Sequence, residues 1–223
     1  MRKTIFILFI AIALSASSLY AQTDNTDTQF WNETSLEFPL DRDNKKLSGV
    51  LIGNLRMTDD ISEVSDRRIG FAVKYKVTRN LTVKPSYIFR NQGRPGTDRY
   101  EHRFRLDITP KKNFNKFSIE NRSRFEHRAK TAGRDDDTFY RNRTKIKIPV
   151  KKGNETQFTP FFSNGTYFDI QTPRVHRNDS VAGISKKFND SLAMDFFYQY
   201  RRNFQSGTKH INGIGVNFKF KIK

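Results

Sequence analysis

Acidic and basic side chains alternate along three consecutive segments in the middle of the chain, and these residues have the clearest capacity for chemistry. In residues 99–109, 116–128 and 138–150, charged side chains, mostly arginines with some glutamates, recur at every second position over long runs. An arginine guanidinium binds a carboxylate or a phosphate through two parallel hydrogen bonds. Because side chains two apart in a strand share a face, each segment presents its charges on one side. The pattern predicts internal ion pairs or an anion-binding surface.

A hairpin that pairs Ile108 with Phe117 would set the charges of the first two segments opposite one another. The facing pairs in this register are Arg105 with Glu120, Glu101 with Arg124, and Arg103 with Arg122, and the third segment adds Arg141 with Glu126 and Lys147 with Glu120. Two interpretations remain open: paired structural filler, or a site that selects anions. The residues predicted to carry either role are Arg103, Arg105, Arg122, Arg124, Arg141, Arg143, Glu101, Glu120 and Glu126.

One further constellation has the residue types of a serine hydrolase. The same register sets His102 opposite Ser123 on the other face of the hairpin, with Asn121 diagonal to the pair. A serine hydroxyl beside an imidazole and an orienting amide can act as a nucleophile. A lipid hydrolase that uses these three residues is therefore the enzymatic alternative.

The rest of the sequence carries no catalytic or cofactor motif. HExxH, GxSxG, Walker and GxGxxG patterns are absent, and the four histidines are far apart. Asp135 to Asp137 are interpreted as a solvated turn rather than a calcium site. The chain has no cysteine, which excludes disulfides and thiolate metal ligands. We expect no metal, no cofactor and no enzymatic activity unless the serine hypothesis holds.

The charged segments belong to a longer series of predicted strands. Alternation with period two recurs along the chain and is broken roughly every 8 to 12 residues by Gly, Pro, Asn and Asp. Most segments approach or exceed the roughly 9 to 11 residues with which a tilted strand crosses a bilayer. Eleven segments qualify: Phe30 to Leu40, Leu47 to Thr58, Arg67 to Val77, Leu81 to Arg90, Arg99 to Thr109, Lys116 to Arg128, Thr138 to Val150, Thr156 to Asn164, Val175 to Lys187, Ser191 to Arg202 and Lys209 to Lys223.

The connections between these segments alternate in length. Short turns, such as residues 78–80 and 189–190, are interleaved with longer polar loops, such as residues 91–98 and 203–208. Outer-membrane barrels have short periplasmic turns and longer external loops, and single-chain bacterial barrels have an even number of strands. We therefore expect an all-β fold, a single antiparallel up-and-down transmembrane β-barrel of ten or twelve strands.

Aromatic residues favour the membrane barrel over a soluble sandwich. The predicted strand at 99–109 carries Tyr100, Phe104 and Leu106 on the face opposite its charges. The chain holds 21 Phe and 8 Tyr. Such residues form girdles where a barrel meets the two lipid interfaces. The apolar faces should therefore meet lipid, and the charged faces should fill the lumen.

The N-terminus predicts export. Arg2 and Lys3 precede an apolar run from Ile5 to Leu14, and small residues lead to Ala21. This is the layout of a secretory signal peptide, and the run is too short to span a bilayer as a helix. We predict a signal peptide at residues 1–21, removed after Ala21, and one barrel domain at residues 22–223 in the outer membrane of a Gram-negative cell.

The chain resembles the outer-membrane-type barrels of domain of unknown function family 2490. The resemblance covers the mature chain and rests on five patterns: Phe30-Trp31-Asn32-Glu33, Tyr100 to Arg105, Glu120 to Arg128, Tyr140-Arg141-Asn142-Arg143, and the strand from Ile211 to Phe220. It implies the fold and the location and supplies no catalytic residues. The chain departs from many barrels in that Lys221-Ile222-Lys223 follows the terminal aromatic residue.

The sequence thus predicts a non-enzymatic outer-membrane barrel that acts structurally or as a narrow pore favouring anions. The formal net charge of +18 fits this bias. Export disfavours nucleic acid as a partner and favours outer-membrane lipids or lipopolysaccharide, with the barrel assembly machinery needed for insertion. A soluble periplasmic β-protein that binds anionic ligands is the third hypothesis.

Overall fold

The computed structural model describes residues 26–222 except 42, 45, 94–98, 132 and 206–207. The predicted signal peptide lies outside the described residues. No helix within them is long and apolar enough to cross a membrane. The strands are β1 (Thr26–Pro39), β2 (Leu47–Thr58), β3 (Glu63–Lys76), β4 (Leu81–Gln92), β5 (Arg99–Asn113), β6 (Ser118–Lys130), β7 (Asp137–Lys147), β8 (Val150–Lys152), β9 (Glu155–Asp169), β10 (Arg174–Lys187), β11 (Leu192–Asn203) and β12 (His210–Lys221).

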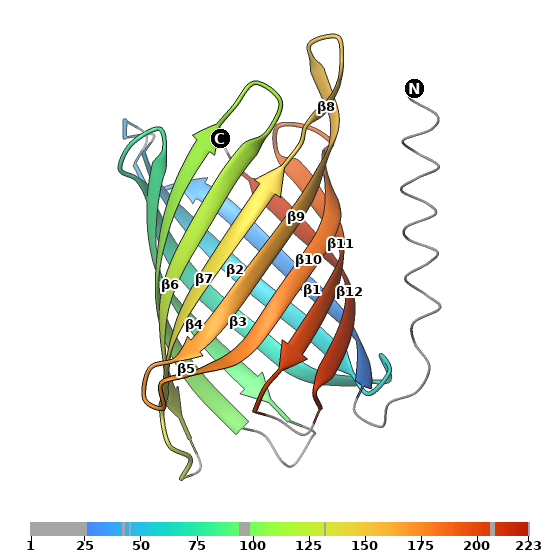
Figure 1. Cartoon of the computed structure of the whole chain (residues 1–223). Helices are drawn as coiled ribbons and strands as arrows, with labels where there is room; N and C mark the ends of the chain where they lie inside the picture. Colours follow the sequence, from blue (N-terminus) through green and yellow to red (C-terminus); the bar gives the residue numbers. More distant parts are fainter. Residues whose placement is uncertain are drawn as a thin grey trace.

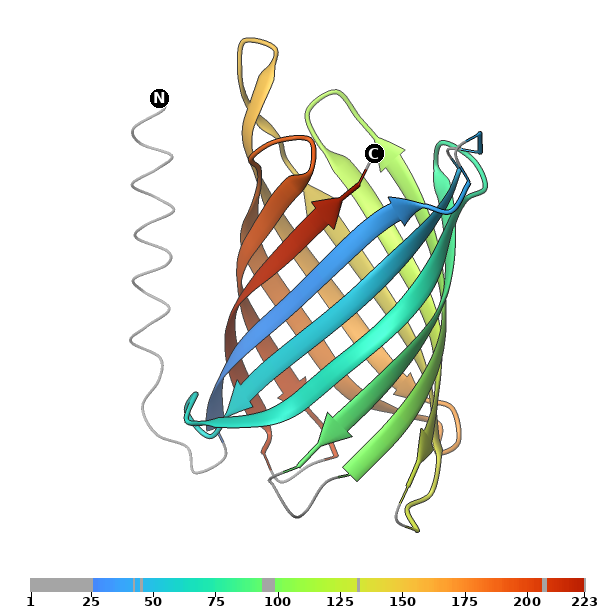
Figure 2. The ribbon, with the colours of Figure 1, turned by 180° about the vertical axis from the view of Figure 1, so that it is seen from behind.

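These strands form one closed ring (Figure 1). Strands β1 to β7 pair in chain order, β7 pairs with β9, and the order continues through β10 and β11 to β12, which returns to β1. Short strand β8 pairs with the start of β9 and extends this hairpin beyond the ring. Consecutive strands of the ring are antiparallel, whereas β1 and β12 run side by side in the same direction through twelve residue pairs (Figure 2).

The described strands therefore make an eleven-strand barrel, and the prediction of ten or twelve purely antiparallel strands is wrong. Each of the eleven alternating segments of the sequence corresponds to one strand of the ring, with β8 continuing the line of β7 after Pro149. An odd number of up-and-down strands leaves the first and the last pointing the same way. Such a ring closes through a parallel pair, whose hydrogen bonds are evenly spaced but slanted.

Connection lengths follow the prediction only in part, because seven residues separate β1 from β2 at the rim that holds the short turns, and only four separate β2 from β3 and β9 from β10 at the other rim. The short connections at residues 77–80, 114–117 and 188–191 lie at one rim, together with the end of β12. We call this the turn rim. At the other rim lie the start of β1 and the strand ends that flank two longer connections, Gln92 with Arg99 and Asn203 with His210, and we call this the loop rim.

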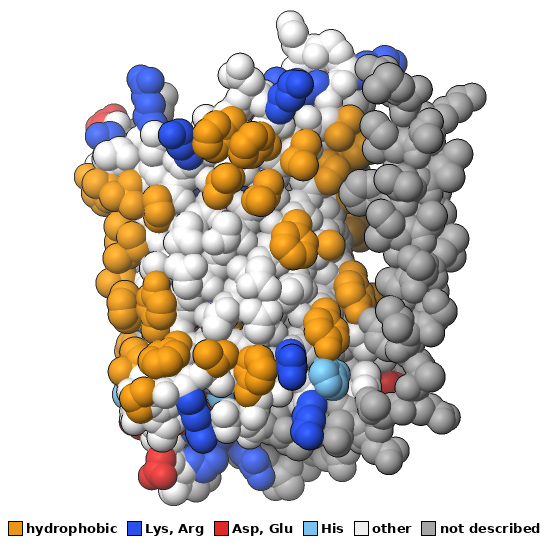
Figure 3. All heavy atoms as spheres, in the orientation of Figure 1, with side chains coloured by type: hydrophobic (Ala, Val, Ile, Leu, Met, Phe, Trp, Pro, Cys, Tyr) orange, Lys and Arg blue, Asp and Glu red, His pale blue; other side chains and the backbone are white. Residues whose placement is uncertain are grey.

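The inward and outward faces of the strands also follow the predicted alternation. On β5 the inward Glu101 and Asp107 are 3% and 1% exposed, whereas the outward Phe104 and Leu106 are 53% and 38% exposed. The same contrast holds around the ring, with exposed outward residues that include Leu51, Ile69, Phe71, Phe125, Phe162, Ile184, Phe196 and Ile214. Figure 3 shows hydrophobic side chains over the wall and Lys and Arg gathered towards its two ends. The barrel is apolar outside and charged inside, the reverse of a soluble protein.

One part of the outer wall is polar but uncharged. We call it the outer polar strip, and it consists of Asn121, Ser123, Asn142, Thr144, Asn164, Thr166, Asn178 and Ser180 on β6, β7, β9 and β10. Asn121 and Asn142 each donate to the other's Oδ1 at 3.0 Å, and Asn164 and Asn178 form a similar reciprocal pair at 2.9 and 3.1 Å. These amides therefore find hydrogen-bond partners within the strip.

Apolar side chains also reach the lumen, whose faces were predicted to be charged. Val50, Ile52, Ala72 and Ile88 form a buried cluster on the inner faces of β2, β3 and β4. Space for it comes from Gly70, since a Cβ at that position would lie 2.5 Å from the carbonyl oxygen of Tyr87 and would meet Ile88. This cluster gives one side of the lumen an apolar wall.

Candidate functional site in the barrel lumen

Buried carboxylates on β5 and β6 are each surrounded by arginines. Glu126 is the centre of one group, with the Nε atoms of Arg105 and Arg128 each 2.6 Å from its carboxylate and Nη1 of Arg103 at 3.7 Å. Glu101 pairs with Arg103 on its own strand. A buried carboxylate needs such partners because its desolvation is otherwise costly.

Asp107 holds the next group towards the turn rim. Arg124 donates two hydrogen bonds to it, from Nε to Oδ1 at 2.5 Å and from Nη2 to Oδ2 at 2.8 Å. Arg122 and Lys84 approach the same carboxylate at 3.7 and 3.8 Å. The bidentate pair is the strongest geometry available to arginine, so Asp107 is committed to Arg124.

The network continues around the lumen on both sides. Asp66 pairs with Arg68 and, at 2.8 Å, with Arg90, which also bonds Glu101 at 3.0 Å. Across the barrel, Asp179 is held by Arg201 at 2.8 Å and approached by Arg141 at 3.4 Å. These contacts fill the part of the lumen nearer the loop rim with ion pairs.

Two aromatic residues stand inside this network between arginines. The ring of Trp31 lies between Arg56 and Arg201, whose Cζ atoms are 3.9 and 4.4 Å from it. The ring of Tyr167 lies likewise between Arg141 at 4.3 Å and Arg177 at 3.6 Å. Guanidinium groups stack well on aromatic faces, so these rings separate like charges that face one another. Phe and Tyr residues were predicted at the lipid interfaces, so the position of Tyr167 between lumenal arginines was not predicted, and neither was that of Trp31.

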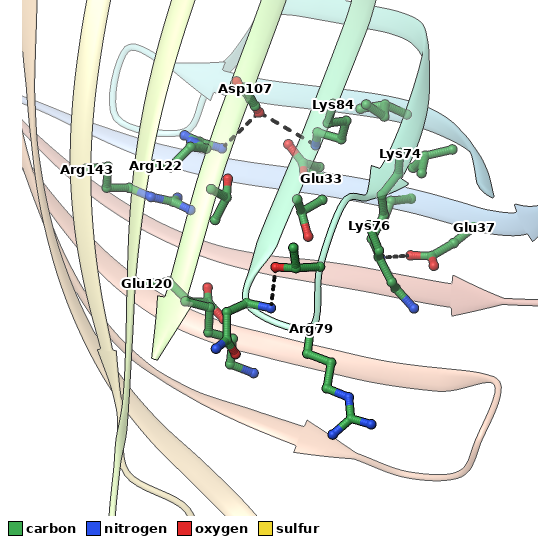
Figure 4. Close-up of a pocket in the computed structure, with 18 residues that line it drawn as sticks. Glu33, Glu37, Lys74, Lys76, Arg79, Lys84, Asp107, Glu120, Arg122 and Arg143 are labelled. Atoms are coloured by element: carbon green, nitrogen blue, oxygen red, sulfur yellow. Dashed lines mark hydrogen bonds and ion pairs between the residues drawn. The ribbon is translucent and has the colours of Figure 1, made fainter. Parts of the chain in front are cut away.

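The lumen contains a chamber at the turn rim (Figure 4). Its volume is about 500 Å³, and the connection Thr78 to Asn80 contributes to its lining. Seven Lys and Arg side chains line it against four carboxylates, those of Glu33, Glu37, Asp107 and Glu120. Glu37 is bound by Lys74 at 2.7 Å, and Glu120 by Lys147 at the same distance. The chamber therefore carries an excess of positive charge.

The structure brings the predicted lumenal residues together, but the predicted register of the β5–β6 hairpin is wrong by six residues. Ile108 lies opposite Ser123, not Phe117. Arg105 consequently pairs with Glu126 rather than Glu120. Strand β5 continues through Pro110 to Asn113, and the hairpin turns between Phe114 and Phe117, whose rings stack at 4.5 Å. Because six is an even number, every side chain keeps its predicted face.

Of the other predicted pairings of opposite charges, the one between Lys147 and Glu120 is present and the remaining ones are not. Glu101 contacts Arg90 and Arg103, not Arg124. Arg141 lies opposite Arg124 and contacts Asp179 instead of Glu126. The predicted contact of Lys147 with Glu120 is present at 2.7 Å. Arg103 lies opposite Arg128 and not opposite Arg122 as predicted. On β6 and β7, Arg122 faces Arg143 and Arg124 faces Arg141.

The three residues of the hydrolase alternative do not meet. His102 lies opposite Ala129 and its Nδ1 is 2.7 Å from the hydroxyl of Tyr87. Ser123 lies on β6 six residues before Ala129, and its hydroxyl is 3.0 Å from that of Tyr140. Six residues of extended strand separate the two by about 20 Å. The predicted juxtaposition of His102 and Ser123 is therefore wrong, and Asn121 belongs to the outer polar strip.

This fold is a β-barrel of the outer-membrane type. The model of the family described as "Protein of unknown function (DUF2490)" matches residues 28–212, which is most of the chain, so the chain belongs to that family. No curated protein matches it.

Solved structures share the architecture. LpxR from Salmonella typhimurium superposes with a TM-score of 0.53 at 8% identity, over 84% of this chain and 87% of that one. The siderophore receptor PirA from Pseudomonas aeruginosa gives a TM-score of 0.34 at 14% identity, over 82% of this chain and 35% of its own. The likeness to LpxR concerns the fold alone, and that to PirA is too distant to carry an argument.

Proposed function

We propose that this protein is a non-enzymatic outer-membrane β-barrel that binds anions in its lumenal chamber. The observation that carries the proposal is the inverted distribution of side chains, with an apolar outer wall and charged groups within. In water that wall would be an extensive exposed apolar surface, which soluble monomers avoid. In a bilayer it is the expected surface of a barrel. The soluble periplasmic alternative is disfavoured for this reason.

The proposal includes export through the signal peptide, insertion by the barrel assembly machinery, and contact with outer-membrane lipids or lipopolysaccharide. Short turns of such barrels face the periplasm and longer loops face the outside. The turn rim and its chamber would then open towards the periplasm. The chamber's excess of Lys and Arg favours anions over cations.

The lumen is proposed to be closed to free ion flow. Asp107, Glu126 and Asp179 are almost completely buried among arginines, so little water reaches them. A narrow anion-favouring path would require this network to open. The barrel therefore acts first as a binding scaffold and not as an open pore.

The test combines three measurements on the purified mature protein. Extraction should require detergent, and the folded protein should migrate differently on a gel before and after boiling. Titration calorimetry should detect sulfate binding that weakens with salt, because screening acts within about 8 Å at physiological ionic strength, and should detect no Mg²⁺ binding. Planar bilayers should show no steady conductance. Extraction without detergent, or a steady cation-selective current, would overturn the proposal.

A further inference from the structure

Two arginines in the chamber face one another without a carboxylate between them. Arg122 on β6 lies directly opposite Arg143 on β7, and both line the chamber. Figure 4 shows the two side chains next to each other and directed into it. Like charges directly opposite on neighbouring strands destabilise a sheet unless something neutralises them.

The surrounding residues do not supply that neutralisation. Asp107 is the nearest acidic partner of Arg122, at 3.7 Å, but Arg124 already holds it in a bidentate pair. Within the described part of the chain, Arg143 has no carboxylate at ion-pair distance. The Nε atoms of Arg122 and Arg143 are both buried and have no hydrogen-bond partner there. A guanidinium has five N–H donors and no acceptor, so both groups have unused donors.

Gly165 leaves space for the stem of Arg143 beside the chamber. It lies opposite Arg143 on β9, and a Cβ at this position would approach Cβ and Cγ of Arg143 at 3.2 Å and Nε of Arg141 at 3.3 Å. The glycine thus leaves room for two arginine stems side by side. The absence of a side chain at Gly165 therefore allows the positive charges of Arg141 and Arg143 to lie close together.

We propose that Arg122 and Arg143 together seat the phosphate group of a small organic phosphomonoester. A phosphate dianion offers several acceptor oxygens and matches two guanidinium forks in both charge and geometry. It would neutralise the facing arginines and use donors that the chain leaves free. This inference rests on the proposed function, since it names the ligand class and the seat within the anion-binding chamber.

The rest of the chamber fits the organic part of such a ligand. Val50 and Ile52 line it from β2, about halfway round the ring from Arg122 and Arg143. A volume of about 500 Å³ lies in the range of small-molecule sites, and bare phosphate would leave most of it empty. A ligand with its phosphate on the two arginines would reach the apolar wall with its other end.

The experiment uses the whole mature protein in detergent, with phenyl phosphate and inorganic phosphate as probes in calorimetric titrations. Phenyl phosphate should bind several-fold more tightly than inorganic phosphate. Arg143→Gln and Arg122→Gln should each weaken both probes by about tenfold or more, the usual effect of losing hydrogen bonds between charged partners. Lys112→Gln removes one positive charge from the outer face of β5 next to the chamber residue Lys111, and should leave binding within about twofold. Val50→Ala should weaken phenyl phosphate and spare inorganic phosphate.

A stability measurement shows whether a variant that binds weakly is folded. In phosphate-free buffer Arg143→Gln should be at least as stable as the wild type, because it relieves the repulsion from Arg122. Phenyl phosphate at a fixed concentration should then raise the unfolding midpoint of the wild type more than that of the variant.

The possible results separate the claims. Equal, small effects of Arg143→Gln and Lys112→Gln would refute the seat, while retained sulfate binding would leave the proposed function standing. Absence of any anion binding by the wild type would refute both the phosphate seat and the proposed function. A final arm places the protein in nanodiscs that contain phosphatidic acid. If this lipid blocks phenyl phosphate, the phosphomonoester is supplied by a lipid headgroup at the turn rim, and if it does not, the ligand is a soluble phosphomonoester.

Discussion

Replacing Glu126 by glutamine should be among the most damaging single changes to the barrel. The Glu126 side chain is 3% exposed, and four arginines lie within ion-pair distance of it. Glutamine keeps the shape and one carbonyl acceptor but removes the charge, which leaves Arg105 and Arg128 without their nearest counter-ion. Removing one member of a buried ion pair typically costs about 3 to 5 kcal/mol, because the remaining charge stays buried without a partner.

Glu120→Gln is the matched control. This substitution is chemically identical and lies on the same strand, but the side chains of Glu120 and Lys147 are 19% and 31% exposed. Partly solvated pairs contribute about 0 to 1 kcal/mol, so this variant should be nearly neutral in stability.

The assay can use the single tryptophan of the chain. Trp31 lies in the lumen between Arg56 and Arg201, so its fluorescence should report loss of the internal packing during urea unfolding in detergent. The two midpoints, converted with the measured denaturant slope, give the difference in free energy of unfolding. If Glu126→Gln and Glu120→Gln cost the same, the network near the loop rim is wet and the closed-lumen proposal is refuted.

Three further predictions concern the wall. Leu106→Arg should lower the free energy of unfolding in lipid by roughly 2 to 4 kcal/mol if the site is near the bilayer midplane, and Tyr100→Arg, which is nearer the loop rim, should lower it by less. Equal costs of the two variants in urea titrations in liposomes would contradict a membrane-facing wall. Asn121→Ala should cost about 1 to 3 kcal/mol because Asn142 loses both of its 3.0 Å bonds to Asn121 and keeps only contacts of 3.4 Å with Ser123 and Tyr140. The double variant with Asn142→Ala should recover part of that loss in the same titration. Gly215→Ala should cost about 1 to 3 kcal/mol by overpacking, since a Cβ there would lie 2.5 Å from the Trp31 carbonyl oxygen and would collide with Phe197. Gly53→Ala should be tolerated, because the nearest atom to a Cβ at that position is 4.0 Å away.

Which side chains face the lumen could be predicted from the sequence, but which of them meet could not. Alternation is a local property with period two, so Glu101, Asp107 and Glu126 were assigned to the correct face without knowledge of the register. A hairpin register depends on where the turn lies, and any even shift preserves the faces. The predicted strand ended at Thr109, although β5 continues through Pro110 to Asn113. The Phe114-Asn115-Lys116-Phe117 sequence held the missed information, since its two aromatic residues close the turn by stacking.

The strand number illustrates a different kind of error. The alternating segments numbered eleven, but a rule drawn from other bacterial barrels replaced that number with an even one. Residue patterns contain no information about how the first strand meets the last, since Thr26 and His210 are far apart in sequence. The chamber was missed for a related reason. Arg122 and Arg143 were both predicted to face inward, but their direct opposition depends on the β6–β7 register.

The parallel seam between β1 and β12 makes the two ends of the barrel distinguishable by chemistry on the chain itself. Thr26 begins β1 at the loop rim, whereas Lys221 ends β12 at the turn rim. In an even-stranded barrel both ends emerge on the same side, so the two terminal labels give the same answer and neither serves as a control for the other. If the barrel spans the membrane as proposed, an epitope placed just before β1 and another placed after β12 would lie on its opposite faces. Antibody or protease access to one epitope and not the other in intact cells would then read out the orientation of the barrel directly.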